Sequence, residues 1–530
     1  MKRRITYVQR PDAPFEPHQA NLASTGLSIR DLDAAREDRI TIELDDLPEE
    51  LRTVLQQSRG LHLRWATERP YDAVAPFASR VSPGLHVHFT PATPDQPTEA
   101  LCEVLRTVFG TSEGDQYGVD CSKPEDSFIT PPPLSTKFGA STSLQFYTRL
   151  PSLQSLVGFI RRTACHQTEG GSAECHDHAD SLLSADSVDI DYDNTSHTLT
   201  VSGLWASSPE GGWTEEIKKP ASKADQIEFG LLGAEKGIEP EEIKMGGILA
   251  VVGKDKKFKP TMFSFPSRNH PLSEPGSYTV SFPPPTGLHP TMSISMPRSS
   301  LKRPPAPQDT TCALHTYLTL PSTVFGDQYQ LATTDPLFLE SHNLVGLRAF
   351  AGETDLEAPD WVVQRWGSNW LFELATPSED SVAVTSTSSN WTVTIPLHLR
   401  YLQPSESGYR STHVPWPVVF WACTSDDDTK MGVNPFERAN LGWDGLFGPR
   451  TLFYQLHPSS DRLVEDLDVP VLRLQSDGLF QARNIELGTC AVIVLGFLWV
   501  LWRLVRVAWS SGVGSGAAPR RAKAVHEKKQ

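Results

Sequence analysis

The sequence lacks an apolar stretch in its first twenty residues, so we expect no ordinary signal peptide. Basic residues are outnumbered, with 48 Lys and Arg against 64 Asp and Glu, which gives a net charge of -16. Because nucleic-acid phosphates need a basic face, we expect no nucleic acid as a partner. Cysteine is scarce as well, and seven cysteines are too few for a disulfide-dense scaffold.

Recognisable catalytic motifs are also missing. The sequence contains neither a Gly-rich phosphate loop of the Walker type nor the H-E-x-x-H pattern of zinc proteases. We find no arrangement of nucleophile, base and orienting group that could be defended as an active site. The expectation is therefore a protein with no catalytic residue, no cofactor and no bound metal.

Two segments do carry residue types that bind metals. Asp189, Asp191 and Asp193 resemble the D-x-D pattern that holds a metal-bound sugar nucleotide, but they alternate with apolar residues, so we favour a strand whose aspartates face water. The second segment joins Cys165-His166 to Cys175-His176-Asp177-His178, and its spacing matches no common zinc site. A disulfide or an unstructured insert is the better interpretation of that segment.

One long apolar segment lies near the C-terminus. The sixteen residues from Leu487 to Trp502 contain no charge, and the apolar character continues to Trp509 with only Arg503 and Arg506 interrupting it. A helix over 487–509 would be about 34 Å long, which is enough for a hydrocarbon core of roughly 30 Å. The sequence therefore predicts a single-pass membrane protein with a large body before the helix.

The charge around this helix predicts its orientation. From Arg503 onward the chain carries a net +6, and the remainder carries -22 because the total is -16. The positive-inside rule places the tail, residues 510–530, in the cytosol and the body in the lumen. The Asn194-Thr195-Ser196 and Asn390-Trp391-Thr392 sequons agree, since N-glycosylation occurs in the secretory lumen. The alternative is a tail-anchored protein with a cytosolic body.

The body reads as short strands separated by turns, and its 43 prolines exclude long helices. We expect a mainly β fold, with tandem antiparallel sandwich-like domains, few helices and the one C-terminal transmembrane helix. The predicted divisions are an N-terminal α+β or β domain, a charged linker, a strand-rich middle segment, a Pro-rich linker and a last β domain. They span residues 1–206, 207–246, 247–298, 299–311 and 312–480, followed by the membrane helix and the basic tail.

Ordered motifs in the last part of the chain resemble the PIG-X family, including its fungal members, the protease B non-derepressible proteins. They are Leu314-His315-Thr316-Tyr317, Phe325-Gly326-Asp327-Gln328-Tyr329, Asp355-Leu356-Glu357-Ala358-Pro359, Ile395 to Tyr401 and Pro417 to Cys423. The resemblance covers residues 312–509, about two fifths of the chain, and the N-terminal part resembles the fungal extension with less distinctive motifs.

The resemblance implies a non-catalytic subunit of glycosylphosphatidylinositol mannosyltransferase I in the endoplasmic reticulum. Its implied partner is the polytopic catalytic subunit PIG-M, which adds the first mannose to the anchor precursor. The main alternative is a broader lumenal chaperone or adaptor, and a third is a glycosyltransferase that uses the Asp189 segment. Within the matched region, His398, Arg400 and Tyr401 are candidates for partner contact or ordinary solvent-facing residues, and Cys312 and Cys423 are candidates for a disulfide.

Overall fold

The computed structural model describes most of the chain. The described residues are 1–10, 15–77, 80–93, 99–110, 118–132, 143–165, 172–235, 242–272, 276–306, 310–353, 355–377, 390–425, 436, 442–448, 450–474 and 481–510. They divide into two units: the first comprises residues 1–402 and 411–469, and the second comprises residues 403–410 and everything from 470 onward. The mainly β fold class predicted from the sequence is confirmed, and most strand pairs are antiparallel.

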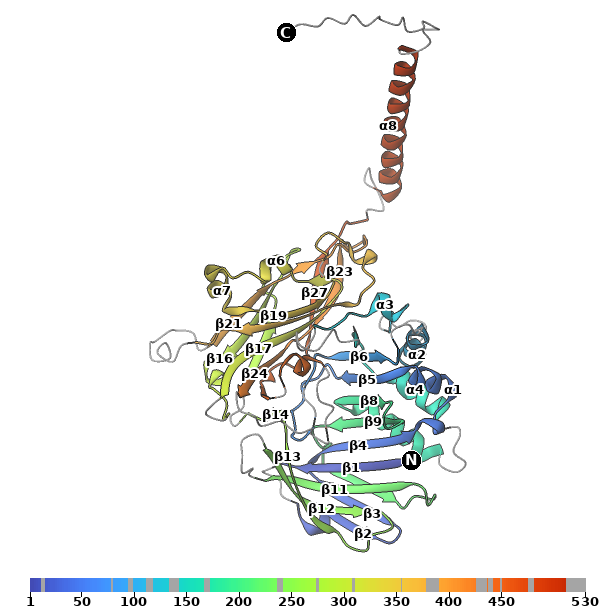
Figure 1. Cartoon of the computed structure of the whole chain (residues 1–530), viewed down its shortest axis with the longest axis vertical. Helices are drawn as coiled ribbons and strands as arrows, with labels where there is room; N and C mark the ends of the chain where they lie inside the picture. The colour runs from blue at the N-terminus through green and yellow to red at the C-terminus, as the bar shows by residue number, and fades with distance from the viewer. Residues whose placement is uncertain are drawn as a thin grey trace, which may run out of the picture. The chain divides into compact units, whose positions relative to one another are not determined.

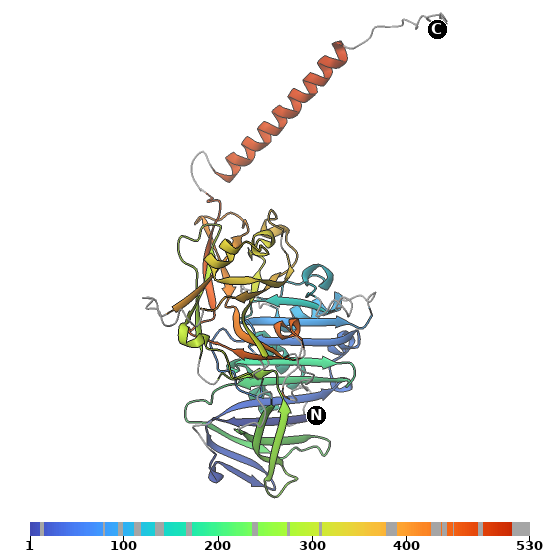
Figure 2. The ribbon, with the colours of Figure 1, turned by 60° about the vertical axis from the view of Figure 1, so that its left-hand side comes forward.

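A ten-stranded sheet dominates the N-terminal half of the first unit, and its strands lie side by side in both views (Figure 1 and Figure 2). In spatial order the strands are β13 (Lys259–Pro266), β12 (Glu242–Val251), β11 (Gln226–Glu235), β1 (Lys2–Gln9), β4 (Ala34–Glu43), β9 (Thr198–Trp205), β8 (Ser187–Asp193), β5 (Ser58–Ala66), β6 (Gly84–Pro91) and β7 (Leu144–Thr148). Only the β1–β11 pair among these is parallel.

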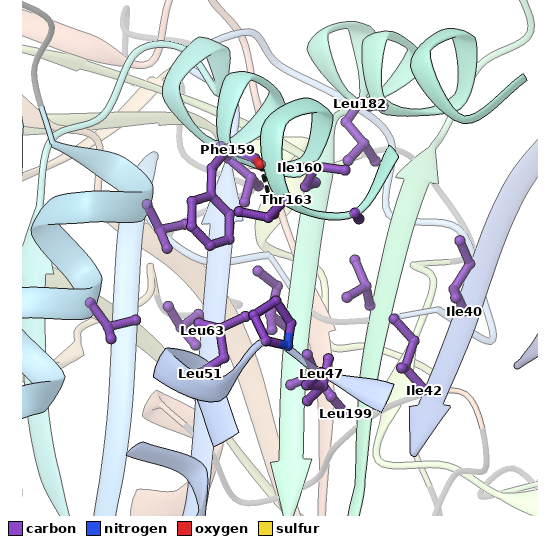
Figure 3. Close-up of a pocket in the computed structure, with 18 of the residues that line it drawn as sticks. Ile40, Ile42, Leu47, Leu51, Leu63, Phe159, Ile160, Thr163, Leu182 and Leu199 are labelled. Carbon is purple, nitrogen blue, oxygen red and sulfur yellow. Dashed lines mark hydrogen bonds between the residues drawn. The ribbon is translucent and has the colours of Figure 1, made fainter. Parts of the chain in front are cut away.

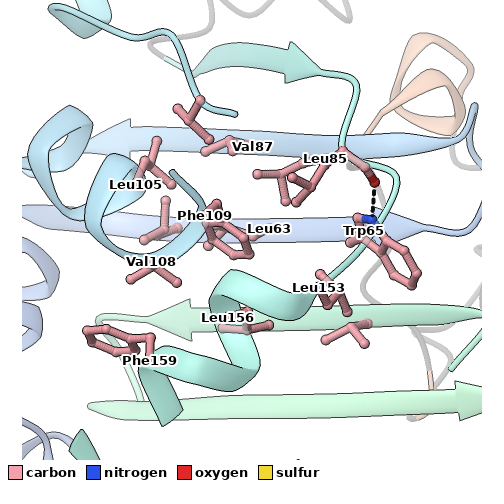
Figure 4. Close-up of a cluster of buried hydrophobic side chains, with 14 of the residues drawn as sticks. Leu63, Trp65, Leu85, Val87, Leu105, Val108, Phe109, Leu153, Leu156 and Phe159 are labelled. Carbon is pink, nitrogen blue, oxygen red and sulfur yellow. Dashed lines mark hydrogen bonds between the residues drawn. The ribbon is translucent and has the colours of Figure 1, made fainter. Parts of the chain in front are cut away.

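Four helices cover one face of this sheet over strands β4 to β6, and we call this side the helix face. They are α1 (Glu49–Gln56), α2 (Glu99–Phe109), α4 (Gln154–Thr163) and α5 (Ser172–Ser181). Their apolar sides meet those of the strands in one large core, in which Leu105 and Phe109 of α2 and Leu156 of α4 lie over Leu63 and Val87 (Figure 4). Helices with an apolar stripe bury it in this way against a sheet.

The rest of the helix face is covered by a small sheet instead of helices. Its strands are β10 (Trp213–Lys218), β3 (Gly26–Leu32) and β2 (Ala20–Ala23). Ile29 and Ile217 of the small sheet pack against Ile5, Tyr7 and Phe229 of the large sheet. This end of the N-terminal half is therefore two packed layers of sheet.

The C-terminal half of the first unit consists of further sheets. The six-stranded sheet has the order β14 (Asn269–His270), β25 (Thr451–Gln455), β24 (Val418–Ser425), β17 (Thr310–Pro321), β20 (Gly367–Leu374) and β19 (Leu344–Gly352). The four-stranded sheet has the order β21 (Asn390–Pro396), β16 (Thr291–Pro297), β15 (Ser277–Ser281) and β26 (His457–Pro458). Two short pairs join β18 (Val324–Phe325) to β22 (His398–Leu399) and β23 (Tyr409–Pro415) to β27 (Val464–Pro470).

Short helices complete the first unit. They are α3 (Pro124–Ser127), α6 (Gln328–Leu331) and α7 (Pro336–His342).

Specific hydrogen bonds join the two halves of the first unit. The Asn369 side-chain amide donates to the Gln145 side chain at 2.9 Å, and the Trp366 indole N–H donates to the Gln145 carbonyl oxygen at 3.0 Å. The Trp443 indole N–H donates to the Arg80 carbonyl oxygen at 3.0 Å.

Part of the expected organisation is wrong in detail. The segment 207–246 was expected to be a charged linker, but it contains β10, β11 and the start of β12. Its described charged residues are exposed or half-exposed, whereas Phe229 and Leu231 pack on one face of β11 and Leu232 packs on the other, so this strand is buried on both faces. The middle segment 247–298 is divided between sheets: β12 and β13 belong to the ten-stranded sheet, whereas β15 and β16 pair with β26 and β21.

Candidate partner interface

The second unit contains the helix that was expected to cross the membrane. Helix α8 (Ala482–Ser510) includes the span Arg483–Trp509, 27 residues with a mean hydropathy of 2.1, which is long and apolar enough to cross a bilayer. Within the described part of the chain it is the one helix that meets this criterion. The Arg503 and Arg506 guanidinium groups lie over the rings of Trp499 and Trp502. The tail, residues 511–530, lies outside the described residues.

Three disulfides join the six cysteines that precede α8. Cys312 and Cys423 are directly opposite in the β17–β24 register, with their Cα atoms 4.0 Å apart. The other two bonds tie helices to nearby chain, Cys102 of α2 to Cys121 and Cys165 to Cys175 of α5. The second of these uses both cysteines of the segment considered for zinc. Among the residues that the structure describes, no cluster of His, Cys, Asp and Glu could hold a metal ion.

Both sequons lie at accessible positions. Asn194 is exposed in the turn between β8 and β9, where its side-chain oxygen accepts a hydrogen bond from the Tyr192 hydroxyl at 3.3 Å. Asn390 is exposed at the first position of β21, an edge strand of the four-stranded sheet. A glycan at either residue would project from the surface of the body.

The aspartates of the D-x-D-like segment do not simply face water, as we had expected. They lie on the face of the ten-stranded sheet opposite the helices, where Arg64 donates to Asp189 at 2.6 Å and His62 lies 3.3 Å from both Asp189 and Asp191. Burial alone would raise the pKa of Asp189, but Arg64 and His62 outweigh it and hold the pKa well below its ordinary value. Asp189 and Asp191 are half-buried partners of the buried Arg64 and His62 in an ion-pair network, which a strand pattern read alone did not reveal.

Arg400 is buried, which contradicts both expectations for it. Its side chain is 2 % exposed, so it is neither a solvent-facing residue nor a directly presented contact. The guanidinium donates to the carbonyl oxygens of Ser322 at 2.9 Å and Ala358 at 2.8 Å, and also to that of Asp355. Burial lowers the pKa of Arg400 without removing its charge. The residue is a buried hub that holds several segments together.

The segments held by Arg400 are those of three family-like motifs. The guanidinium of Arg400, which itself lies in the 395–401 motif, is 4.3 Å from the centre of the Phe325 ring in the 325–329 motif. It also donates hydrogen bonds to the backbone of the 355–359 motif. The amide N–H of Asp360 also donates to the Tyr401 carbonyl oxygen at 3.1 Å. Asp327 caps α6 by accepting from the backbone N–H groups of Tyr329 and Gln330. Motifs far apart in the sequence are therefore brought to one place.

These segments present large apolar side chains to the surface, and we call this set the apolar rim. Trp361 is 55 % exposed, Val362 60 % and Tyr401 64 %. The complete rim is Tyr329, Leu356, Trp361, Val362 and Tyr401. Trp and Tyr are common anchors of protein interfaces, so exposed apolar side chains on the segments around Arg400 make this region a candidate contact surface. Sequence reasoning missed Trp361 and Val362, although they directly follow the 355–359 motif.

His398, the third candidate, is half-buried at the edge of the same region. Its ring stacks on Phe325, and its Nδ1 atom lies 3.0 Å from the Nδ1 atom of His289. Burial, followed by the neighbouring His289, lowers the pKa of His398. Of the three candidates, Tyr401 is thus the exposed one. Arg400 positions it, and His398 packs against Phe325.

These features define a class: a β-rich protein with a helix able to span a membrane and an apolar surface built on a buried arginine. Comparison with known proteins gives the family. The PIG-X / PBN1 family model matches residues 285–505. Protein pbn1 of Aspergillus oryzae is 58% identical over 542 residues, 97% of each chain, and protein pbn1 of Neurospora crassa is 39% identical over 97% of this chain and 96% of its own length. The chain belongs to the PIG-X / PBN1 family.

More distant relatives match less of the chain. Protein PBN1 of Saccharomyces cerevisiae is 27% identical over 219 residues, which is 41% of this chain and 42% of that protein. The family-model match runs from residue 285 to residue 505, so it includes the whole Arg400 region and most of α8. The part of the body that carries the apolar rim is therefore the part that the family model describes.

Proposed function

We propose that the chain is a non-catalytic, stabilising subunit of the endoplasmic reticulum mannosyltransferase that adds the first mannose to the glycosylphosphatidylinositol anchor precursor. Its partner is the polytopic catalytic subunit, a protein of the PIG-M kind. The observation that carries this proposal is membership of the PIG-X / PBN1 family over nearly the whole chain.

The geometry around Arg400 supports a role in binding a partner. A buried charge that bonds three backbone carbonyl groups fixes loops which would otherwise be free to move. Preorganised loops bind with less loss of conformational entropy, so side chains on them make better anchors. In this proposal Trp361 and Tyr401 contact the catalytic subunit, and Arg400 is a positioning residue.

The compartment is also part of the proposal. Three disulfides in the body favour an oxidising environment, and both sequons are exposed where a lumenal enzyme could reach them. Together with the basic tail they support a lumenal body, a single crossing through α8 and a cytosolic end in the endoplasmic reticulum membrane.

Depletion of the protein from its host tests the subunit role. We expect the catalytic subunit to fall in abundance, the first mannosylation step to slow, and both proteins to co-purify at a fixed ratio in mild detergent. Re-expression of the wild-type chain should restore all three. If the catalytic subunit stays at its normal level and many lumenal proteins misfold instead, the chain is a general chaperone and the subunit proposal is wrong.

A further inference from the structure

An apolar cavity lies inside the N-terminal half of the body, under the helices that cover the large sheet. Its volume is about 290 Å³. Side chains of α4, among them Phe159 and Ile160, point into it from one side, and Ile40 and Ile42 of β4 line it from another (Figure 3). The remaining lining comes mainly from Leu, Val and Ile side chains of α1, α2, β5, β8 and β9.

The size of the cavity favours occupation by a ligand. An engineered apolar cavity of about 150 Å³ binds benzene, and natural ligand pockets begin at about 300 Å³. Protein interiors are otherwise close-packed, and an empty apolar void destabilises the fold in proportion to its volume. The lining is mostly aliphatic, with Asp38, Thr163 and His178 as polar exceptions, so most of its surface offers no hydrogen-bond partner and fits a flexible hydrocarbon chain.

A second, more polar hollow adjoins the cavity, and we call it the entrance because a ligand that passed between the shared side chains would reach the cavity from it. It lies between α1 and α2, has a volume of about 420 Å³, and shares Leu51, Val104, Val108 and Phe159 with the apolar cavity. The same four side chains therefore separate the two spaces. A hydrocarbon chain that passed between them would extend from the second hollow into the apolar cavity.

The entrance is acidic. Its polar lining includes Glu49, Glu50 and Glu103, together with Thr53 and Thr107. Glu49 forms an ion pair with Arg52, whereas Glu50 and Glu103 add two further exposed carboxylates. Carboxylates repel a phosphate or a second carboxylate and attract an ammonium group. The charge at the entrance therefore favours a ligand with an amine-bearing head.

We infer that the cavity binds the hydrocarbon chain of an amphiphile whose amine-bearing head lies beside Glu50 and Glu103. The protein has its own membrane helix, so lipids of the surrounding bilayer are one source of such a ligand. A free amphiphile from the lumen is the other source. The inference does not depend on the subunit role, because the cavity is built from α1, α2, α4, α5 and the large sheet, away from Arg400.

Photolabelling of the full-length protein in lipid nanodiscs tests the site. The probe is hexadecylamine with a diazirine in its chain, and the comparison probe is the matching diazirine fatty acid. We expect saturable labelling of peptides from α1, α2 and α4, with the amine preferred by about fivefold, a factor in keeping with two exposed ion pairs. One arm dissolves the probe in the nanodisc bilayer and the other delivers it from a soluble carrier. Labelling in either arm supports the site, and the stronger arm identifies the source.

Variants separate the cavity from its entrance. Val201→Phe fills the cavity from β9 and should abolish saturable labelling, whereas Val345→Phe, at an exposed position of β19, should not. Glu50→Gln combined with Glu103→Gln should remove the preference for the amine while chain binding persists, and Glu216→Gln on β10 is the matched control. Val104→Phe replaces Val201→Phe if the latter lowers the unfolding temperature strongly.

Three results would contradict the inference. One is the absence of saturable labelling in these helices in both arms. Another is unchanged labelling in a folded Val201→Phe or Val104→Phe protein, which would place the probe elsewhere. The third is labelling of the protein by the fatty-acid probe as strong as that by the amine probe, which would contradict the assigned head group.

Discussion

The guanidinium of Arg400 lies 4.3 Å from the centre of the Phe325 ring, which places a buried cation on an aromatic face at the end of the β18–β22 pair. The same group bonds the backbone of Ser322, Asp355 and Ala358. A single side chain thus joins three motifs whose spacing along the sequence gives no sign that they meet. The consequences of this arrangement can be measured.

Replacement of Arg400 by Met should destabilise the body. The substitution keeps much of the side-chain volume but leaves three carbonyl groups without their charged donor, so we expect a loss of about 2–5 kcal/mol in the free energy of unfolding. Denaturant unfolding of the solubilised full chain measures this loss. Arg30→Met, at an exposed position of β3, is the control and should change the free energy by less than about 0.5 kcal/mol. Equal stability of the two variants would show that Arg400 is not a hub.

The apolar rim should matter for the partner and not for the fold. Trp361→Ser with Tyr401→Ser removes two exposed anchors, so the free energy of unfolding should change by less than about 1 kcal/mol. In cells the double variant should reduce co-purification of the catalytic subunit by tenfold or more, since interface anchors of this kind contribute about 2 kcal/mol or more each. Met262→Ser, equally exposed on β13, is the control. Normal co-purification of the double variant would place the interface elsewhere.

Local patterns allowed some of this fold to be predicted. Alternating apolar residues on both sides of the Asn-Thr-Ser-His turn predict a hairpin over residues 188–205, and β8 and β9 lie there. The residue patterns of 98–109 and 153–163 predict helices, and α2 and α4 match these bounds within one residue. In each case the signal is contained in a short window of sequence, so no distant contact is needed to interpret it.

Features that depend on distant contacts were missed. Strand β11 pairs with β1, more than 200 residues earlier, and its charged flanks made the segment look like a linker. Strand β4 contains the run Arg36-Glu37-Asp38-Arg39, yet the first three residues are buried because Arg36 pairs with Asp38 at 2.8 Å and Arg39 with Glu37 at 2.8 Å. A run of charges predicts an exposed segment unless its partners are known. Arg400 was misjudged for the same reason.

The buried histidines should make stability depend on pH. His86 is buried, its Nε2 atom lies 2.7 Å from the Ser82 carbonyl oxygen, and burial lowers its pKa to about 4. In the unfolded chain the pKa is about 6.5, so the unfolded state takes up a proton first as the pH falls. The contribution of His86 is therefore complete above pH 6.5 and is lost between about pH 6.5 and 4, at up to about 1.4 kcal/mol per pH unit.

His88 has a lowered pKa as well and adds to this loss, whereas His62 has a raised pKa and contributes most below pH 6.5. Burial alone would lower the pKa of His62, but its hydrogen bonds to Asp189 and Asp191 outweigh that effect. Urea unfolding at pH 7, 6 and 5 measures how the free energy of unfolding changes with pH. This free energy should fall less steeply with falling pH for His86→Gln than for the wild type. An identical pH dependence of the two proteins would mean that His86 does not titrate in this way.

The disulfide between β17 and β24 should stabilise the last part of the body. Loss of a native disulfide that closes a loop of this length, with partners 111 residues apart, costs about 2–5 kcal/mol. Cys312→Ala with Cys423→Ala should therefore lower the unfolding temperature, and Cys490→Ala, a free cysteine in α8, should not. Peptide mapping without reduction should recover Cys312 joined to Cys423. Recovery of both as free thiols would contradict the assignment.

Glycosylation of the body is the prediction on which the lumenal topology depends. Endoglycosidase H treatment of the native membrane protein should increase its mobility, and Asn194→Gln with Asn390→Gln should abolish that shift, because both asparagines are exposed. A shift that disappears in the variants would place the body in the lumen, in the same compartment as the disulfides require. If no shift occurs, protease treatment of sealed microsomes decides the case: a protected body is lumenal with unused sequons, whereas a digested body is cytosolic. A cytosolic body would leave the disulfides without an oxidising environment and would refute the lumenal subunit proposal.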